Sequence, residues 1–375
     1  MRHAWSLAWR AGMTALLLAW AFHAIFHDQC RVVLAVEEVD LDAMPRWERW
    51  SAVWSLGPSE LWRTVVGVRA DWLVVSIGLW GLTIGIGAWR WLLVLRSQGL
   101  DPGYKRSLEI SLVAHFFNSF FLGSAGGDVL KAYYAAQVTR HLKTEAVTTV
   151  LLDRVLGLFS MLGFAALMVL PNLAWVRVHR ETQVLAVVIL AMFAVAGAFL
   201  WLSLKGGVST VFPVIRVWLD KLPKADLVER GIQAGRSLGR KRGQVIRVVA
   251  GSVVLTLVCV LQLAALVWGY GMEVAWRPLL FVVPAVICLS ALPLTPGGLG
   301  VRDNLYVYLL SLPQIGVRSD KALAISLVAY ACSLFWSALG GVLYLAMRRE
   351  TDLAVAVAEE RALGREDGAD GDGSG

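Results

Sequence analysis

Six stretches of the sequence are apolar over about 20 residues or more, the length that an α-helix needs to cross the hydrocarbon core of a bilayer. A mean hydropathy of +0.63, with 57% hydrophobic and only 17% charged residues, excludes a soluble globular chain. The predicted spans are residues 8–26, 71–95, 145–170, 182–204, 247–270 and 321–347. The sequence therefore predicts an all-α, polytopic membrane protein with six full transmembrane helices.

Two further apolar stretches are too short to cross alone, and glycines and charges interrupt both of them. Residues 120–134 read FFLGSAGGDVLKAYY, and residues 293–306 read PLTPGGLGVRDNLY. The stretch 108–122 makes a helix of only about 22 Å, against a core of about 30 Å. Backbone that leaves a helix at membrane depth is tolerated only where protein buries it or a wet cavity borders it. We therefore predict two re-entrant helical hairpins, over residues 108–138 and 278–312.

Basic residues set the orientation of these segments. The stretch 205–247 carries ten Lys or Arg against three acids, so the positive-inside rule places it in the cytoplasm. If the two hairpins enter from opposite faces, both termini are cytoplasmic as well. The acidic loop after the first span is then external, and residues 59–68 (SELWRTVVGV) are predicted to form an interfacial helix capped by Ser59.

Two units of the same design follow one another in opposite orientation. Each contains a span, a hairpin and a second span, and inverted repeats with broken helices are the architecture of alternating access. The units are residues 71–170 and 247–347. The chain then divides into residues 1–70, with the first span and an external segment, a transmembrane domain over residues 71–347, and a polar tail over residues 348–375 that we expect to be disordered.

The candidate substrate site consists of the residues at the two breaks and the charges near them. A helix that restarts after a break offers unpaired N–H groups and a positive dipole end, which suit a phosphate or a carboxylate. Lys131 and Arg302, each four residues after a glycine pair, add a full positive charge. The alternative is structural: Lys131 extends to the interface, and Arg302 neutralises a neighbouring Asp. The candidates are Asn118, Gly126, Gly127, Asp128, Lys131, Asp153, Arg154, Gly297, Gly298, Arg302 and Asp303.

Asp153 and Arg154 lie inside the third predicted span, where each charge needs a partner. Neighbouring residues on a helix point about 100° apart, so these two cannot simply neutralise each other. We predict that Arg154 pairs with Asp128, and that Asp153 pairs with Lys131 or Arg302. Such pairs act either as permanent staples of the fold or as gates that open during transport.

Two smaller signals lie beside these charges. Gly157 follows within one turn and is predicted to give another element a small surface for close approach. His115 and Asn118 lie one turn apart on the first hairpin arm. They either line the crevice or make packing hydrogen bonds.

No metal or other cofactor is expected. The four cysteines form no CxxC motif, and the six histidines form no metal-ligand pair. No P-loop is present, which argues against direct use of ATP.

The residues at both breaks resemble the flippase-like membrane region of the lysylphosphatidylglycerol synthases, the multiple peptide resistance factor family, in a stand-alone form. Over most of residues 60–347 the resemblance is carried by Phe117-Asn118, Gly126-Gly127-Asp128 with Lys131, Asp153-Arg154 with Gly157, and Leu292-Pro293 with Pro296 to Asp303. Leu122, Lys131 and Asp303 stand where the family commonly has proline, arginine and glutamate. The resemblance implies lipid translocation or lipid-linked handling in the bacterial cytoplasmic membrane. Because the bifunctional relatives add a soluble aminoacyl-transferase domain, and this chain ends in a short polar tail, we do not expect synthesis of an aminoacylated lipid.

Two classes of function remain. The first is a translocase that moves a phospholipid or a lipid-linked headgroup through a charged crevice near the midplane. The second is a membrane enzyme or accessory subunit that acts on a phospholipid or polyprenyl phosphate, with Asp128, Asp153 or Asp303 as acid, base or metal ligand. The expected partners are a membrane lipid, a separate lipid-modifying enzyme and a second copy of the chain, and no nucleic acid. No histidine pair or DxD-like acidic cluster accompanies these carboxylates, which favours the translocase over the enzyme.

Overall fold

The computed structural model describes residues 40–120, 126–138, 143–205, 241–273, 275–291, 301–317 and 319–369, together with residue 239 and six single positions between residues 23 and 34. Throughout these residues the regular structure is helical, as predicted, and no strand is present. After a short 3-10 turn at Leu41–Ala43, the helices are α2 (Arg46–Val66), α3 (Ala70–Ser97), α4 (Tyr104–Phe120), α5 (Gly126–Val138), α6 (Lys143–Met168), α7 (Leu173–Val178), α8 (Arg180–Lys205), α12 (Arg242–Gly269), α13 (Trp276–Ser290), α14 (Val301–Leu310) and α15 (Ser319–Ala369).

Five of the described helices are long and apolar enough to cross a membrane. They are α3, the Ala146–Met168 part of α6, the Arg180–Ala198 part of α8, α12 and the Lys321–Ala346 part of α15. Each coincides with one of the predicted spans. The sixth predicted span, residues 8–26, lies outside the described residues except for positions 23 and 26.

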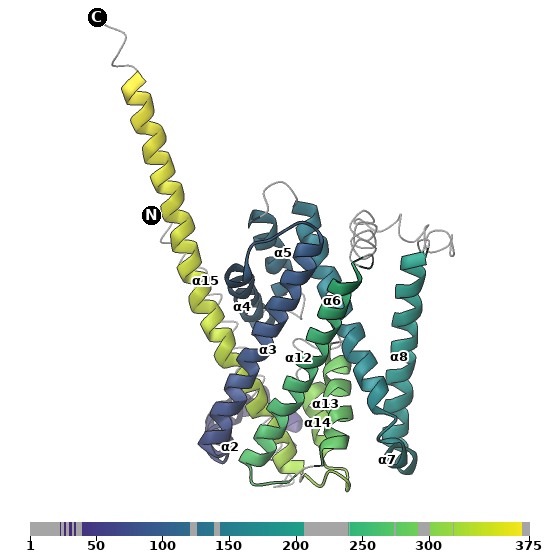
Figure 1. Ribbon diagram of the computed structural model, residues 1–375. Helices are drawn as coiled ribbons and strands as arrows, with labels where there is room; N and C mark the ends of the chain where they lie inside the picture. Colours follow the sequence, from purple (N-terminus) through teal and green to yellow (C-terminus); the bar gives the residue numbers. More distant parts are fainter. Residues whose placement is uncertain are drawn as a thin grey trace, which may run out of the picture.

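Two pairs of shorter helices stand where the arms of the predicted hairpins were expected. In the upper half of the bundle α4 packs against α5, and in the lower half α13 packs against α14 (Figure 1). At 1.5 Å per residue, the 17 residues of α4 span about 25 Å and the ten of α14 about 15 Å. The breaks within both pairs, residues 121–125 and 292–300, lie outside the described residues. That either pair re-enters a membrane from one face stays a prediction.

Contacts between the two predicted units, residues 71–170 and 247–347, are reciprocal. The first helices of the units, α3 and α12, pack along each other. The helix pair of each unit packs on the last helix of the other unit, α4 on α15 and α13 on α6. Small residues permit this close packing: a Cβ atom at Gly251 of α12 would come within 2.8 Å of the Trp89 ring of α3, and one at Gly341 within 2.9 Å of the Phe116 ring of α4.

A polar turn sets the chain reversal between α3 and α4. Asp101 accepts hydrogen bonds from Arg96 Nε at 3.0 Å and from the backbone N–H of Gly103 at 3.1 Å. These two bonds, the Arg96 bond foremost, hold the pKa of the Asp101 carboxyl below its ordinary value. Gly99 and Gly103 have φ angles of +78° and +79°, which side chains with a Cβ rarely adopt. The turn thus returns α4 against α3, so that α4 runs back into the bundle.

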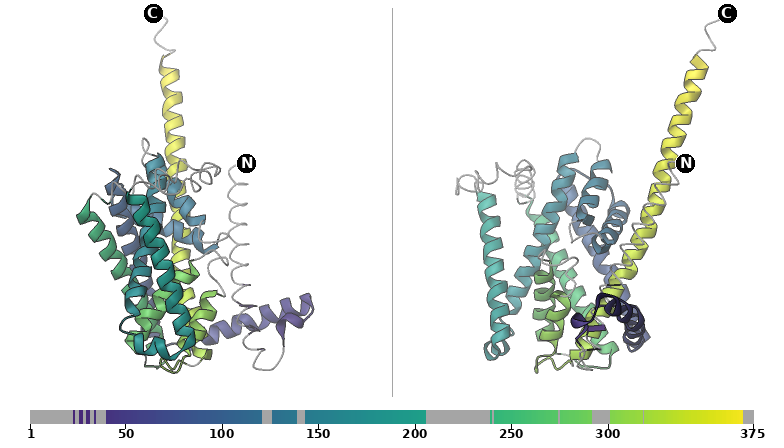
Figure 2. Two further views of the ribbon diagram at one scale, coloured as in Figure 1. Left: turned by 90° about the vertical axis from the view of Figure 1, so that its right-hand side faces the viewer. Right: turned by 180° about the vertical axis from the view of Figure 1, so that it is seen from behind.

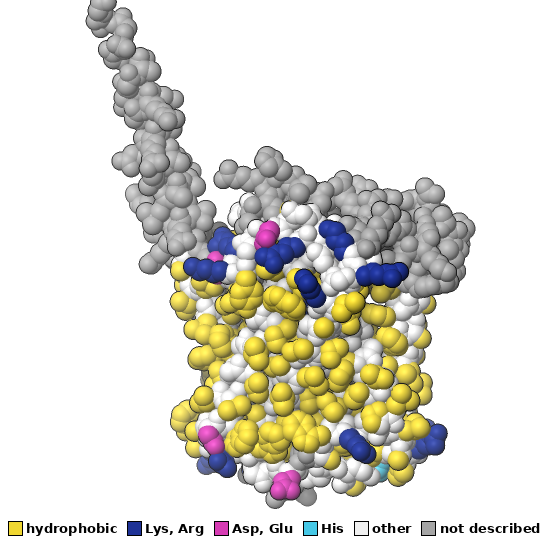
Figure 3. Space-filling model, viewed as in Figure 1, with side chains coloured by type: hydrophobic (Ala, Val, Ile, Leu, Met, Phe, Trp, Pro, Cys, Tyr) yellow, Lys and Arg dark blue, Asp and Glu magenta, His cyan; other side chains and the backbone are white. Residues whose placement is uncertain are grey.

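The surface has a hydrophobic belt between two charged edges (Figure 3). The upper edge is rich in Lys and Arg and the lower edge mixes both signs (Figure 3). We call the upper edge the basic face and define it by residues at the ends of α3, α4 and α12, namely Arg96, Lys105, Arg106, Lys241 and Arg242. The other edge, the opposite face, carries Arg69, Asp71, Glu273 and Arg277. Belt and edges have the form of a membrane-embedded surface.

Helix α2 lies at the opposite face and extends sideways beyond the crossing helices (Figure 2, left). Its tryptophans Trp47 and Trp62 are 75% and 69% exposed, as expected for an interfacial helix. The prediction that this helix begins after a Ser59 cap is wrong, because the helix starts at Arg46 and continues through Pro58. Packing explains the early start: Val53 is fully buried and the side chain of Phe26 packs closely on Gly57, so tertiary contacts hold the residues before Pro58 in a helix.

Helix α15 extends beyond its predicted span to Ala369, into the residues of the predicted polar tail. Residues 353–363 (LAVAVAEERAL) are rich in Ala, Leu and Glu, which are strong helix formers.

Cysteine labelling at both ends of the crossing helices tests this arrangement. We expect Lys105→Cys and Glu273→Cys, each in a background without the four native cysteines, to react with a membrane-impermeant maleimide from opposite sides of the membrane. Detergent-solubilised protein, in which both positions must react, is the control. Labelling of both positions from one side contradicts the two-faced arrangement.

Candidate functional site

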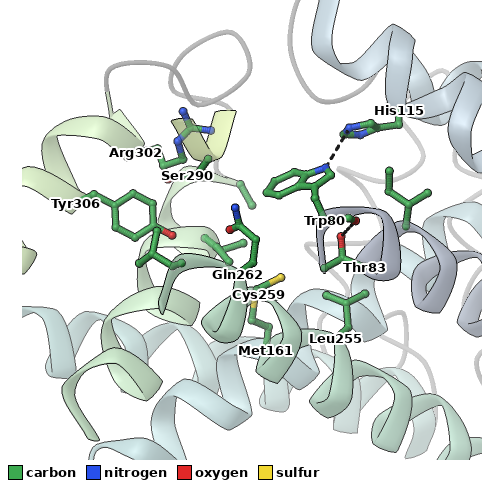
Figure 4. Close-up of a pocket in the computed structure, with 15 residues that line it drawn as sticks. Trp80, Thr83, His115, Met161, Leu255, Cys259, Gln262, Ser290, Arg302 and Tyr306 are labelled. Atoms are coloured by element: carbon green, nitrogen blue, oxygen red, sulfur yellow. Dashed lines mark hydrogen bonds between the residues drawn. The ribbon is translucent and has the colours of Figure 1, made fainter. Parts of the chain in front are cut away.

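A cavity of about 410 Å³ lies in the middle of the bundle, between the two helix pairs (Figure 4). Both predicted units contribute to it, through α3, α4, α6, α12, α13, α14 and α15. The residues that line it are Trp80, Thr83, Ile84, His115, Met161, Leu255, Cys259, Gln262, Leu263, Ile287, Ser290, Ala291, Arg302, Tyr306 and Ala329. A mostly apolar wall with a few polar groups is typical of a ligand site.

The polar groups converge from two sides of this cavity. Arg302 and Tyr306 of α14 lie on one side, and Trp80 of α3 faces them from the other (Figure 4). Trp80 donates from its indole Nε1 to His115 Nε2 at 3.4 Å. Gln262 of α12 lies between the two sides (Figure 4), and its side-chain amide donates to Ser76 Oγ at 2.8 Å. The cavity therefore offers one cationic group and several hydrogen-bonding groups within an apolar lining.

Arg302, which lines the cavity, is fixed in place by an ion pair. Its Nη2 lies 2.9 Å from Asp303 Oδ1, and the two side chains are 15% and 5% exposed. Ser326 of α15 also donates to this carboxylate, at 2.5 Å. The guanidinium lies over the Tyr330 ring, 4.9 Å from its centroid. The structural role predicted for Arg302, neutralising a neighbouring Asp, is thus present, and the same side chain borders the cavity.

A second group of charges joins α3, α5 and α6. Asp153 accepts from Arg90 Nε at 2.9 Å through Oδ1, and Lys131 Nζ lies 3.5 Å from Oδ2. Arg90 also donates to Ser252 Oγ of α12 at 3.1 Å. The ammonium of Lys131 lies 4.3 Å from the centroid of the Trp91 ring. We call Arg90, Lys131 and Asp153 the charged triad, and at 9–12% exposure its side chains are nearly buried.

The predicted pairing of the charges is largely confirmed. Arg154 forms an ion pair with Asp128, and Asp153 pairs with Lys131 rather than with Arg302. Arg302 pairs with its own neighbour, Asp303, in the other repeat unit.

Helix α5 is fixed to α4 at the first break. Asn118 Oδ1 accepts a hydrogen bond from the backbone N–H of Gly127 at 2.9 Å. Gly126 is the first residue of α5, and any Cβ at Gly127 would strike the Ala114 carbonyl. Gly297 and Gly298 fall in the stretch 292–300, outside the described residues.

The predicted close approach at Gly157 is also confirmed. A Cβ at this position would come within 2.6 Å of Arg90 Nη1, so the glycine makes room for the guanidinium.

Sequence reasoning missed Arg90, the central cation of the triad. The signal was available, because an arginine within the predicted span 71–95 is an intramembrane charge and therefore a functional candidate. Gln262 and Tyr306 carried no comparable signal, since uncharged polar residues are common in buried helices. Of the eleven candidates, Arg302 lines the cavity, with Asp303 paired to it. Lys131 and Asp153 belong to the triad, and Asp128 and Arg154 form a pair of their own. Asn118, Gly126 and Gly127 lie at the first break.

Within the described residues no group of three or more His, Cys, Asp or Glu side chains is placed to hold a metal ion.

Replacing Gly157 tests whether the triad is a tightly packed unit. We expect Gly157→Ala to lower stability by about 1–2 kcal/mol, because the added methyl group displaces a guanidinium held by several hydrogen bonds. Gly78→Ala in α3 is the matched control, since nothing lies within 4 Å of a Cβ there and alanine favours a helix. Thermal unfolding in detergent measures both. Equal melting temperatures for the two variants contradict the packing argument.

Charge reversal separates a gate from a staple at Asp128 and Arg154. These side chains are 29% and 34% exposed, so breaking the pair strands neither charge completely. For a gate, we expect Asp128→Arg and Arg154→Asp each to lower the melting temperature in detergent only slightly, and the double variant to melt like the wild type. Unfolding of both single variants, with stability regained in the double, identifies a staple instead.

The chain is similar to known membrane proteins over most of its length. The family model described as the lysylphosphatidylglycerol synthase TM region matches residues 49–341. A UPF0104 membrane protein of Methanothermobacter thermautotrophicus is 24% identical over 309 residues, 76% of this chain and 86% of the relative. Similar proteins of the same description occur in Methanocaldococcus jannaschii, at 22% identity over 79% of this chain and 91% of the relative, and in Pyrococcus horikoshii, at 22% over 75% and 89%.

Proposed function

Because the chain belongs to the family of the lysylphosphatidylglycerol synthase TM region and has several apolar crossing helices, we propose that it is a lipid translocase of the flippase type. The substrate is a phospholipid or another lipid with a phosphate-bearing headgroup. The headgroup passes through the central cavity while the acyl chains stay in the surrounding membrane. The observation that carries this proposal is Arg302, a cation on the wall of a largely apolar cavity within the bundle.

The size and the lining of the cavity support a headgroup as its occupant. A volume of about 410 Å³ falls within the range of about 300–1,000 Å³ that small-ligand sites have. Arg302 presents a charged donor, and Tyr306, Ser290 and Gln262 present hydrogen-bonding groups. A guanidinium binds phosphate oxygens through short, charge-assisted hydrogen bonds. When the cavity holds no headgroup, Asp303 supplies the counter-charge.

Reciprocal packing of the two units supports alternating access. One helix of each short pair packs on the last helix of the other unit, α4 on α15 and α13 on α6. Tilting one pair therefore changes the packing of both units. We propose that the pairs are re-entrant hairpins in inverted repeats, which open the cavity to one face at a time. In this arrangement the basic face is cytoplasmic, as are both termini.

The alternative, a membrane enzyme or an accessory subunit of one, needs a carboxylate free to transfer protons or bind a metal. In the described structure Asp128, Asp153 and Asp303 each pair with a basic side chain. Such pairing suits positioning and charge balance better than acid–base catalysis. Purified protein incubated with labelled lipid separates the two functions, because an enzyme alters the mass of the lipid and a translocase alters only its leaflet.

Removing the Arg302 charge without stranding its partner tests the proposal. We expect the double variant Arg302→Met with Asp303→Asn to slow redistribution of a fluorescent phospholipid in proteoliposomes about tenfold or more, because the lost contact contributes on the order of 1.4 kcal/mol. Arg242→Met, which removes one of the charges at the basic face, is the control and should keep the wild-type rate. Equal rates in the two variants, with both correctly folded, rule out the headgroup role of Arg302.

A further inference from the structure

Charge balance at the triad is incomplete. Arg90 and Lys131 bring two positive charges, and Asp153 brings one negative charge. The Asp128–Arg154 pair beside them is neutral by itself. A net positive charge at the depth of an apolar bundle is costly unless an anion joins it.

The surplus charge belongs to Lys131. Arg90 is the more firmly bound cation, since it donates to the Asp153 carboxylate, to the Asp153 carbonyl at 3.4 Å and to Ser252 at 3.1 Å. Arg90 Nε lies 2.9 Å from the Asp153 carboxylate, whereas Lys131 Nζ lies 3.5 Å from it. Beyond this long contact and the Trp91 ring, the ammonium has no partner among the described residues. An ammonium has three donors, so Lys131 is equipped to bind an additional acceptor.

The triad lies less than two helical turns inward of the basic face. Arg90 precedes Arg96 by six residues along α3, which is about 9 Å of helix. Arg96 itself is 45% exposed and marks the edge of the belt. A headgroup that enters from this leaflet moves inward by about that distance to reach the triad.

The surface beside the triad suits acyl chains. Val129 and Tyr133 of α5 are 67% and 54% exposed, and Leu151 and Val155 of α6 are 49% and 38% exposed. These apolar side chains flank the half-exposed Asp128–Arg154 pair, where α5 packs against α6. Charge behind an apolar surface is the arrangement that a lipid with an anionic headgroup matches.

We propose that Lys131, held between Asp153 and the Trp91 ring, binds the phosphate of an anionic phospholipid on the side of the basic face, at a site separate from the central cavity. One negative charge on the headgroup balances the triad. This inference rests on the proposed function only in treating the site as one that a lipid occupies before it reaches the cavity. Binding itself requires no transport.

Lipid binding to the purified protein in detergent tests the site without any transport step. The readout is the apparent dissociation constant for phosphatidylglycerol and for phosphatidylcholine with the same acyl chains, from native mass spectrometry. We expect Lys131→Met to weaken phosphatidylglycerol binding about tenfold and to leave phosphatidylcholine unchanged, since a charge-assisted hydrogen bond is lost. The Arg90–Asp153 pair stays neutral in this variant, and methionine packs well on Trp91, so the fold is preserved.

Three controls complete the test. Lys105→Met removes an exposed lysine at the basic face and should change binding less than twofold, whereas Lys131→Arg should retain the preference for the anionic lipid. Inorganic phosphate at the same concentration should not compete, because it lacks the acyl chains. Equal losses in Lys131→Met and Lys105→Met, equal affinity of the wild type for both lipids, or full competition by inorganic phosphate each overturn the site. Specific binding without movement in proteoliposomes keeps this site and overturns the translocase instead.

Discussion

Every charge placed within the apolar bundle needs a partner, and this requirement determines how the helices meet. A charge at membrane depth costs several kcal/mol if it is left alone. Asp153 is therefore held from two other helices, by Arg90 of α3 and Lys131 of α5, and Asp303 is held by Arg302 and by Ser326 of α15. The Lys131 contact ties α5 to α6, and the Ser326 bond ties α14 to α15.

Small residues make this bonding geometrically possible. Gly157 leaves room for the Arg90 guanidinium, and Gly127 lets α5 approach α4 until Asn118 caps its backbone N–H. The two units then join through α3 and α12, with the cavity enclosed between the short pairs. Packing, charge pairing and the position of the cavity are thus consequences of the same close contacts.

The long spans, and the pairing of Asp128 with Arg154, could be predicted from the sequence, because length, hydropathy and the cost of a buried charge act locally. The partner of Asp153 remained open between Lys131 and Arg302, since that choice depends on how the units pack. Arg90 was missed although it lay within a predicted span. The predicted start of α2 was wrong because contacts from outside that helix, such as that of Phe26 on Gly57, hold the residues before Pro58 in a helix. The cavity residues Gln262 and Tyr306 could not be assigned, because α12 and α14 meet only in the folded chain.

Headgroup entry into the cavity is the central claim, and photo-crosslinking tests it directly. A phosphatidylglycerol with a diazirine on its headgroup is reconstituted with the protein, irradiated, and mapped by mass spectrometry. If headgroups enter the cavity, adducts form on the cavity-lining parts of α3, α12 and α14, around Thr83, Gln262 and Tyr306. Adducts confined to the charged edges, around Arg96 and Arg242, contradict it, because they describe a lipid that surrounds the protein and never enters.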